Sequence, residues 1–290
     1  MAAKTEARLA ASSAKTVRRP FVVVRPTSGW AAINLAELWK YRDLLLILAG
    51  RDIKLRYKQT ALGASWAVLQ PFLTMVIFSI FFGRLAQVDS EGLPYPIFSY
   101  AALVPWNFFV HAMAGGSNSL ISNANMVKKI YFPKMTLPIS AALGGLVDFV
   151  LAFAVLVAMM LYYGYVPTAR VIWLPLFLLL TLATSLGAGL WFAALNVRFR
   201  DVRYTVPFIT QAWMFLTPIA YSSTMLEGPW KTVYGLNPMV GVVEGFRWAL
   251  LGTGNSPGPG MIFSALTALA FLVSGVYYFR RVEKDFADVI

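Results

Sequence analysis

The sequence predicts an all-α integral membrane protein with six transmembrane helices, a cytoplasmic N-terminal amphipathic interface helix, and short re-entrant or capping helices between spans five and six. Three observations lead to this prediction. Of the 290 residues, 58% are hydrophobic and 13% are charged, against about 45–50% and about 25% in soluble domains. The apolar residues gather in six long stretches. The basic residues lie mostly on one side of those stretches, as in membrane proteins.

Each of the six apolar stretches is close to the length that a membrane-spanning helix needs. A hydrocarbon core about 30 Å thick is crossed by about 20 helical residues. The stretches contain prolines, which a helix bundle tolerates because neighbouring helices, hydroxyl side chains and water satisfy the freed carbonyls. We therefore predict spans at residues 61–82, 96–120, 137–163, 171–197, 204–221 and 261–279.

The distribution of Lys and Arg predicts the orientation of the spans. With the boundaries above, 21 of the 25 Lys and Arg residues lie before the first span, in the second and fourth loops, or after the last span. The other four are Arg84, Arg170, Lys231 and Arg247. Loops rich in Lys and Arg stay in the cytoplasm, so we expect both termini to be cytoplasmic.

The segment before the first span divides into a tail and a helix. We expect residues 1–29 to form a flexible basic tail, and residues 30–290 to form a single transmembrane domain. Within residues 31–48, a helical period places Leu38, Trp39 and other apolar side chains on one side and polar side chains opposite them. This pattern predicts an amphipathic helix at the membrane surface.

The fifth loop, residues 227–260, is long enough to contain structure of its own. Its stretch 238–251 is mostly apolar but contains Glu244 and Arg247, which share a face of a helix. The stretch is too short and too charged to span a membrane. We predict one or two short helices that enter the outer leaflet, and the alternative is an external cap with an exposed ion pair.

Several classes of protein are disfavoured by what the sequence lacks. It contains no Cys and one His, so we expect no metal site, and it contains no phosphate-binding G-x-x-x-x-G-K-[ST] loop. The loops contain no pair of carboxylates and no nucleophile motif that would indicate an enzyme. The basic residues are interrupted by long apolar runs, which no nucleic-acid-binding groove needs. An energy source would therefore be an ion gradient or a separate ATPase.

An ion-coupled carrier needs ionisable groups inside the membrane, where they are costly and usually functional. Asp148 is the only carboxylate in a predicted span, and His111 is its only candidate partner with a titratable proton. Proton-coupled transport through Asp148 is therefore one hypothesis. The alternative interpretation is that Asp148 is a hydrogen-bonded residue in helix packing.

The predicted cytoplasmic segments carry further patterns. Residues 51–60 place several bases on one face of a helix that leads into the first span. In residues 123–134, the run Ile130, Tyr131 and Phe132 stands among basic residues at an expected turn. Topology explains the bases but not these apolar side chains. Exposed apolar groups surrounded by charge indicate a protein contact.

These segments resemble a known family. The motifs are R-D-I-K-L-R-Y-K-Q-T-A-L-G (51–63), P-W-N-F-F (105–109), N-x-x-x-V-K-K-I-Y-F-P-K (123–134), N-V-R-F-R-D (196–201), T-P-I-A-Y (217–221) and N-P-M (237–239). They resemble the permease subunit of ABC-2 type bacterial polysaccharide exporters. The C-terminal E-K-D-F-A-D-V-I resembles the O-antigen and teichoic acid branch. The resemblance runs from about residue 30 to the end.

The resemblance implies a homodimer in the bacterial cytoplasmic (inner) membrane, bound by two copies of a separate nucleotide-binding ATPase subunit. ATP and Mg would bind the partner ATPase, and this chain would bind no cofactor. In the family, the interface helix and the loop between spans two and three contact the ATPase. The residues that this implies for ATPase coupling are Leu38, Trp39, Asn125, Lys128, Lys129, Tyr131, Phe132, Pro133 and Lys134.

The resemblance also implies a lipid-linked polysaccharide as cargo. The bases at the predicted arrival point of the lipid pyrophosphate are Arg51, Lys54, Arg56 and Lys58, and Arg geometry suits phosphate. Sugar rings have apolar faces that stack on aromatic side chains. Candidate channel-lining residues are therefore Trp66, Phe72, Trp106, Phe109, Trp213, Phe215 and Tyr221. Besides the proton-coupled carrier, the remaining alternative is a membrane-embedded glycan-processing enzyme.

Overall fold

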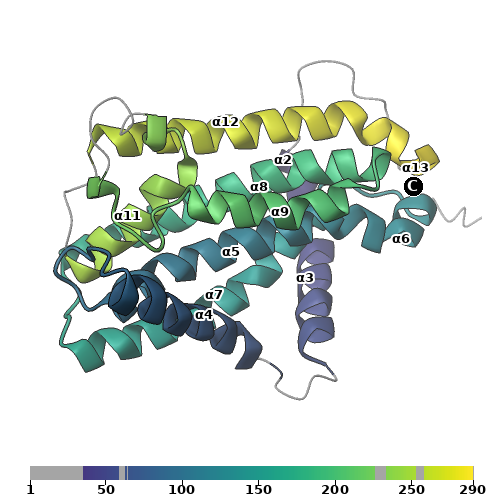
Figure 1. Cartoon of the computed structure of the whole chain (residues 1–290). Helices are drawn as coiled ribbons and strands as arrows, with labels where there is room; N and C mark the ends of the chain where they lie inside the picture. The colour runs from purple at the N-terminus through teal and green to yellow at the C-terminus, as the bar shows by residue number, and fades with distance from the viewer. Residues whose placement is uncertain (1–34, 59–62, 64, 226–232, 253–257, 290) are drawn as a thin grey trace, which may run out of the picture. The chain divides into compact units, whose positions relative to one another are not determined.

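The computed structural model describes residues 35–58, 63, 65–225, 233–252 and 258–289. These residues form helices joined by turns, with no β-strand among them. Residues 32–290 belong to one compact unit, whose helices are drawn in Figure 1. The predicted basic tail, residues 1–29, lies outside the described residues.

Within the described residues, five helical segments are long and apolar enough to cross a membrane. Their boundaries lie within a few residues of predicted spans, so the first four and the last of those spans are confirmed as helices. They are α4 (Ser65–Phe78) with its π-helical continuation Ser79–Leu85, α5 (Tyr95–Ser122), α7 (Thr136–Tyr163), the 3₁₀ turn Ala169–Trp173 with α8 (Leu174–Arg198), and α12 (Pro259–Val282).

The fifth predicted span, residues 204–221, is helical only in part. Helix α9 (Val202–Phe215) has 14 residues, or about 21 Å at 1.5 Å per residue. The chain then turns, and side chains instead of a further helical turn satisfy its carbonyls. The Leu216 carbonyl accepts a hydrogen bond from Asn237 Nδ2 at 2.9 Å. The helix predicted for 204–221 is therefore too long at its end, and the count of six spans stays a prediction.

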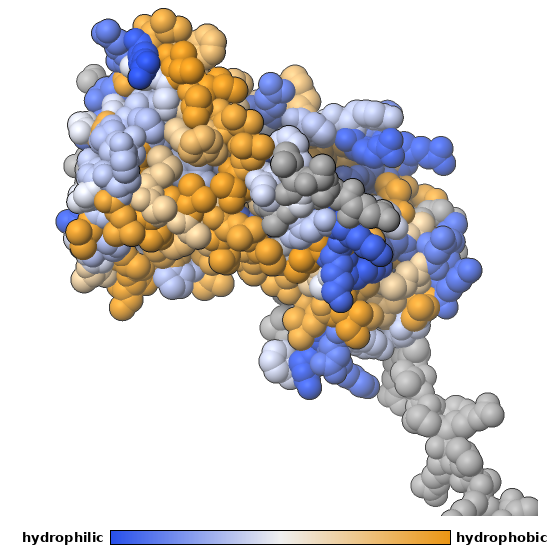
Figure 2. All heavy atoms as spheres, turned by 90° about the horizontal axis from the view of Figure 1, so that it is seen from below, coloured by the Kyte–Doolittle hydropathy of each residue, from blue (hydrophilic) through white to orange (hydrophobic). Residues whose placement is uncertain are grey.

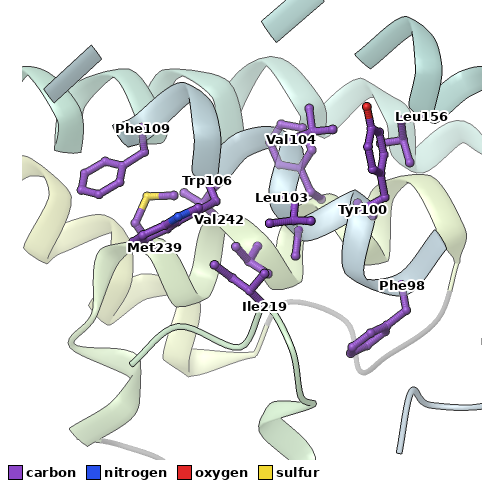
Figure 3. Close-up of a cluster of buried hydrophobic side chains, with 14 of the residues drawn as sticks. Phe98, Tyr100, Leu103, Val104, Trp106, Phe109, Leu156, Ile219, Met239 and Val242 are labelled. Carbon is purple, nitrogen blue, oxygen red and sulfur yellow. The ribbon is translucent and has the colours of Figure 1, made fainter. Parts of the chain in front are cut away.

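Helix α5 is the most enclosed of the five long segments, and it packs against α4, α7, α8 and α11 (Pro238–Leu251). Its side chains form the centre of the main hydrophobic core. Figure 3 shows Phe98, Leu103 and Phe109 of α5 near Ile219 and Val242, which come from the α9–α11 region. The core thus joins residues that are more than a hundred positions apart in the sequence.

Glycines let α8 and α12 approach at backbone contact. A Cβ added at Gly187 of α8 would lie 2.4 Å from the carbonyl carbon of Phe271, and one at Gly275 of α12 would lie 2.3 Å from the Gly187 oxygen. Any side chain at either position would force the two helices apart. Small residues at helix crossings are typical of membrane bundles, where dispersion contacts replace the hydrophobic effect.

The outer surface is strongly apolar. Large exposed apolar side chains occur on several long helices, among them Leu161 on α7, Phe208 on α9 and Val273 on α12. Figure 2 shows hydrophobic residues covering much of one face. A surface of this kind is unfavourable in water and favourable against lipid or another membrane subunit.

The predicted interface helix differs from the observed one. Residues 31–34 lie outside the described residues, and the rest of the segment forms two helices, α2 (Leu35–Lys40) and α3 (Arg42–Tyr57). The backbone at Tyr41 leaves the helical conformation, with φ −98° and ψ 17°. Helix α3 runs nine residues past the predicted end at 48 and packs against α7. The segment therefore belongs to the helix packing as well as to the surface.

Candidate functional site

The loop between α5 and α7, residues 123–135, contains the short helix α6 (Ala124–Lys129). After α6, Ile130 is 59% exposed and Tyr131 is 61% exposed. The expectation of exposure is wrong for Phe132, which is 4% exposed and belongs to a hydrophobic cluster with Phe279 and Phe286. The loop therefore presents two of its three apolar side chains and uses the third to attach itself to the bundle.

The remaining predicted coupling residues of this loop divide in the same way. Asn125, Lys128 and Lys129 are exposed, and Pro133 is buried. The backbone N–H of Lys134 donates to Glu283 Oε1 at 3.0 Å, and its Nζ donates to the Glu283 carbonyl at 2.9 Å. The loop is thus bonded to the C-terminal turn Glu283–Asp285, which leads into α13 (Phe286–Val289).

The other predicted coupling element lies at the same end of the bundle. Leu38 of α2 packs against the hydrophobic cluster that contains Phe132, while Trp39 is 70% exposed. The structure therefore brings together the interface helix and the α5–α7 loop, which are about ninety residues apart in the sequence.

The predicted pyrophosphate-binding bases lie on α3 or directly after it. Lys54 and Lys58 are exposed. Arg51 donates to Asp52 Oδ1 at 2.8 Å and to Asn123 Oδ1 at 2.8 Å. The end of α3 is therefore linked to the start of the α5–α7 loop, and Arg51 already has a carboxylate partner.

Arg56 and Tyr57, at the end of α3, both donate hydrogen bonds to the carboxylate of Asp148 in the middle of α7. We call these three residues the α3–α7 cluster. Burial and the hydrogen bond to Asp148 raise the pKa of Tyr57 to about 12, so its hydroxyl stays protonated and remains a donor. The cluster agrees with the interpretation of Asp148 as a hydrogen-bonded packing residue.

His111 does not bond to Asp148, so its prediction as the partner of that carboxylate is wrong. Its Nδ1 lies 2.9 Å from the Asn107 carbonyl, one turn earlier on α5. Since a carbonyl only accepts, Nδ1 carries the hydrogen. His111 and Asp148 nevertheless line the same cavity of about 250 Å³, which lies where α3, α4, α5 and α7 meet.

The candidate channel-lining aromatics occupy two kinds of environment. Trp66, Phe72 and Phe215 are exposed, whereas Trp106 and Phe109 are buried in the main core. Trp213 and Tyr221 are partly buried. The Trp213 indole donates to Asn237 Oδ1 at 2.8 Å, and the Tyr221 hydroxyl donates to the Phe215 carbonyl at 2.7 Å. The exposed members lie on α4 and α9, and the buried members lie on α5.

At the opposite end of the bundle, Arg247 of α11 is 4% exposed. Its guanidinium donates to the carbonyls of Phe98 at 3.1 Å, Pro218 at 2.6 Å and Ile219 at 2.9 Å. It also lies over the Phe98 ring, 3.5 Å from the centroid. A buried arginine with three carbonyl partners excludes the exposed ion pair of the external-cap alternative. It also explains why the chain can leave the helical path after α9.

Among the residues that the structure describes, no group of three or more His, Cys, Asp or Glu side chains is placed to hold a metal ion. The polar groups gathered by the fold instead fix helix ends and loops to one another.

Comparison with known proteins decides between the hypotheses left open by the sequence. Residues 43–251 match the family described as ABC-2 type transporter. The chain belongs to this family. It is 31% identical to the O-antigen export system permease protein RfbA of Myxococcus xanthus, over 88% of this chain and 98% of the relative. It is 27% identical to the protein of the same name from Klebsiella pneumoniae, over 89% of this chain and 97% of the relative.

A more distant relative is the polysialic acid transport protein KpsM of Escherichia coli, 24% identical over 81% of this chain and 91% of the relative. The prediction of an ABC-2 permease similar to O-antigen export permeases is therefore confirmed. The proton-coupled carrier is not favoured. The chain is a membrane-embedded transport component with several helices suited to crossing a bilayer.

Sequence reasoning missed three of the groups that build this site. Glu283 and Phe286 stand in the C-terminal motif, but no local pattern shows that Lys134 is their partner. Asn123 ends α5 and also accepts from Arg51. These residues stand within the motifs that carry the family resemblance. That position indicates that they matter, but it does not indicate which residues they contact.

Proposed function

We propose that the chain is the channel-forming permease subunit of an ATP-driven transporter that exports a lipid-linked polysaccharide, similar to an O-antigen, across the bacterial cytoplasmic membrane. The observation that carries the proposal is the similarity over nearly the whole length of O-antigen export permeases. The absence of a phosphate-binding loop from the sequence supports a separate ATPase subunit. ATP and Mg would bind that subunit.

The ATPase would dock on the exposed side of the α5–α7 loop together with α2. The proposed contact residues are Trp39, Asn125, Lys128, Lys129 and Tyr131, with Ile130 beside them. Phe132, Pro133, Lys134 and Leu38 would act from behind this surface, because they attach it to the bundle. Movement of the ATPase would then be passed to α5, α7 and the C-terminal turn, instead of being absorbed by a loose loop.

Two copies of the chain and two copies of the ATPase would form the transporter. The apolar outer surface supports both a lipid contact and a contact with a second permease. The exposed aromatics Trp66, Phe72 and Phe215 are suited to line a passage between copies. Trp106 and Phe109 would support that lining from within the core, and Trp213 and Tyr221 are intermediate in exposure.

Both termini and the α5–α7 loop would face the cytoplasm, as the distribution of basic residues predicts. The lipid pyrophosphate would then meet Lys54 and Lys58 first, since these are exposed, whereas Arg51 and Arg56 are bonded to carboxylates. Arg51 and Arg56 would join by exchanging Asp52 and Asp148 for phosphate oxygens. Charge reversal at Lys54 and Lys58 should therefore reduce recruitment of the lipid-linked glycan.

The test is export in the native host. Deleting the chain should abolish surface glycan and leave glycan on the cytoplasmic side, and plasmid-borne protein should restore export. A catalytically inactive partner ATPase should produce the same defect, whereas an agent that dissipates the proton gradient while ATP is held constant should not. If dissipating the proton gradient alone stopped export, and Asp148→Asn also stopped it, the proposal would be contradicted and a proton-coupled carrier supported.

A further inference from the structure

The cavity where α3, α4, α5 and α7 meet is lined by side chains from four separate helices and is partly open, since Trp66 and Gln70 are exposed. Its volume is about 250 Å³, below the roughly 300–1,000 Å³ of sites for drug-sized ligands. Its lining residues all belong to one chain, and one of them, Trp66, is also among the aromatics proposed to line a passage between copies. A space of this size fits a group of one ring, not a long chain.

The walls of the cavity combine aromatic rings with neutral polar groups. Trp66 and Phe149 contribute rings, and Gln70 and Asn107 contribute amides. The Nδ2 of Asn107 is buried without a hydrogen-bond partner. His111 uses Nδ1 for the Asn107 carbonyl, which leaves Nε2 as an acceptor. A ligand that both donates and accepts hydrogen bonds would match this set.

The charge in the cavity argues against an ionic ligand. Its cation, Arg56, and its anion, Asp148, are bonded to each other, so their charges largely cancel. A free phosphate would have to displace the Asp148 carboxylate from Arg56. An acyl chain would leave the Asn107 amide without a partner in an apolar setting, which is costly. A neutral polar ring with an apolar face meets neither obstacle.

We propose that this cavity binds one neutral sugar ring of the exported glycan, with its apolar face against Trp66 and its hydroxyl groups bonded to Asn107, Gln70 and His111. The inference rests on the proposed export function and adds a specific site to it. The α3–α7 cluster forms one side of the cavity. A bound ring would therefore contact the end of α3, the helix that follows the proposed ATPase-contacting element α2.

The test uses a photoreactive benzoylphenylalanine at position 66 in the full transporter, in cells whose glycan is labelled with radioactive sugar. A matched control carries the same group at position 173. The two native tryptophans have nearly the same exposure, 51% at Trp66 and 50% at Trp173, but Trp173 does not line the cavity. We expect a labelled glycan adduct at 66 and little at 173.

Two further variants separate cavity binding from a passing contact. Asn107→Leu and Gln70→Leu each remove one amide from the cavity. Gln70 is exposed, so its substitution should disturb the fold less than that of Asn107. Each should reduce the adduct at 66 by about tenfold, which corresponds to about 1.4 kcal/mol. Thermal stability of each variant in detergent checks that the fold is intact.

The possible outcomes distinguish the inference from the function on which it rests. If export needs the chain, but the adduct at 66 is absent, equals that at 173, or is unchanged by both leucine variants, the sugar site is wrong and the export function stands. A phospholipid adduct in place of the glycan would also overturn the site. If export does not need the chain, the proposed function fails and the sugar site fails with it.

Discussion

Each end of the bundle carries a short helix in a segment that mixes apolar and charged residues, α11 at one end and α6 of the α5–α7 loop at the other. The two segments differ in how far their side chains are buried within the chain. Helix α11 is buried against α5, α8 and α12, and its Arg247 is satisfied by carbonyls of the same chain. The α5–α7 loop buries Phe132 but leaves Ile130 and Tyr131 exposed. The first arrangement is complete within one chain. The second presents a surface suited to a partner.

The contrast separates structural from functional use of similar residues. A charged side chain inside a membrane protein is stable only when its donors are matched, as those of Arg247 are. An apolar side chain exposed beside lysines gains stability from burial only when another protein covers it. We therefore expect changes near Arg247 to affect folding first, and changes near Tyr131 to affect assembly first.

The largest expected effect belongs to Arg247→Met. The substitution leaves three buried carbonyls without their donors, and hydrogen bonds to charged groups contribute about 1.5–3 kcal/mol each. We expect loss of folded protein in detergent, measured by size-exclusion chromatography and thermal unfolding. Arg170→Met is the control, because Arg170 is an exposed arginine that donates to the Gly252 carbonyl at 3.1 Å. Equal stability of the two variants would show that the buried arginine contributes no more to folding than the exposed one.

Phe132→Ala should have the next largest effect. Removing a buried phenylalanine typically costs about 3–5 kcal/mol, so we expect a clear fall in the unfolding temperature. Tyr131→Ala, one residue earlier and 61% exposed, should change stability by no more than about 0.5 kcal/mol. Thermal unfolding of the two purified variants measures this difference. A stable Phe132→Ala protein would show that the loop is attached by other contacts.

Asp148→Asn should destabilise the protein by about 1–2 kcal/mol, because it removes the charge that Arg56 faces, while Arg56 retains 35% side-chain exposure and is partly screened. The double variant Arg56→Gln, Asp148→Asn should recover part of the loss. Thermal unfolding of the single and double variants measures the coupling. Additive losses would mean that the α3–α7 cluster does not act as a pair.

The smallest expected effect belongs to Glu283→Gln. It weakens the bonds that the Glu283 carboxylate accepts from the Lys134 backbone N–H and from Arg280, but it keeps the bond that Lys134 Nζ donates to the Glu283 backbone carbonyl. We expect a loss of about 0.5–1.5 kcal/mol, with increased hydrogen exchange in the α5–α7 loop. Asp285→Asn, an exposed neighbour, should leave exchange in that loop unchanged. Identical hydrogen exchange in both variants would show that the C-terminal turn does not stabilise the α5–α7 loop.

Much of the fold can be predicted from the sequence, because a helix that crosses a membrane needs an apolar stretch of about 20 residues. Five predicted spans lie within a few residues of observed helices. The failure at 204–221 has a specific cause. Hydropathy shows only that this stretch is apolar. It does not show that Asn237 and Arg247, further along the chain, donate to the carbonyls after Phe215 and so permit a turn there.

The site was predictable in its segments but not in its contacts. The motifs identified the α5–α7 loop and α3, because local composition there is unusual. They did not show that Phe132 is buried, since one apolar residue in a basic turn looks the same whether it faces a partner or its own chain. The search for ionisable groups inside the predicted spans gave Asp148 the wrong partner, because Arg56 lies before the first predicted span, 92 positions away on α3.

The measurement that tests the central claim most directly is co-purification in detergent with the candidate partner ATPase. We predict that the intact chain retains the ATPase, and that Tyr131→Ala combined with Ile130→Ala loses it while remaining folded. Tyr162→Ala on α7 is the control, because Tyr162 is also strongly exposed but lies at the other end of that helix. Retention of the ATPase by the double variant, or its equal loss from the Tyr162 control, would contradict docking through the α5–α7 loop.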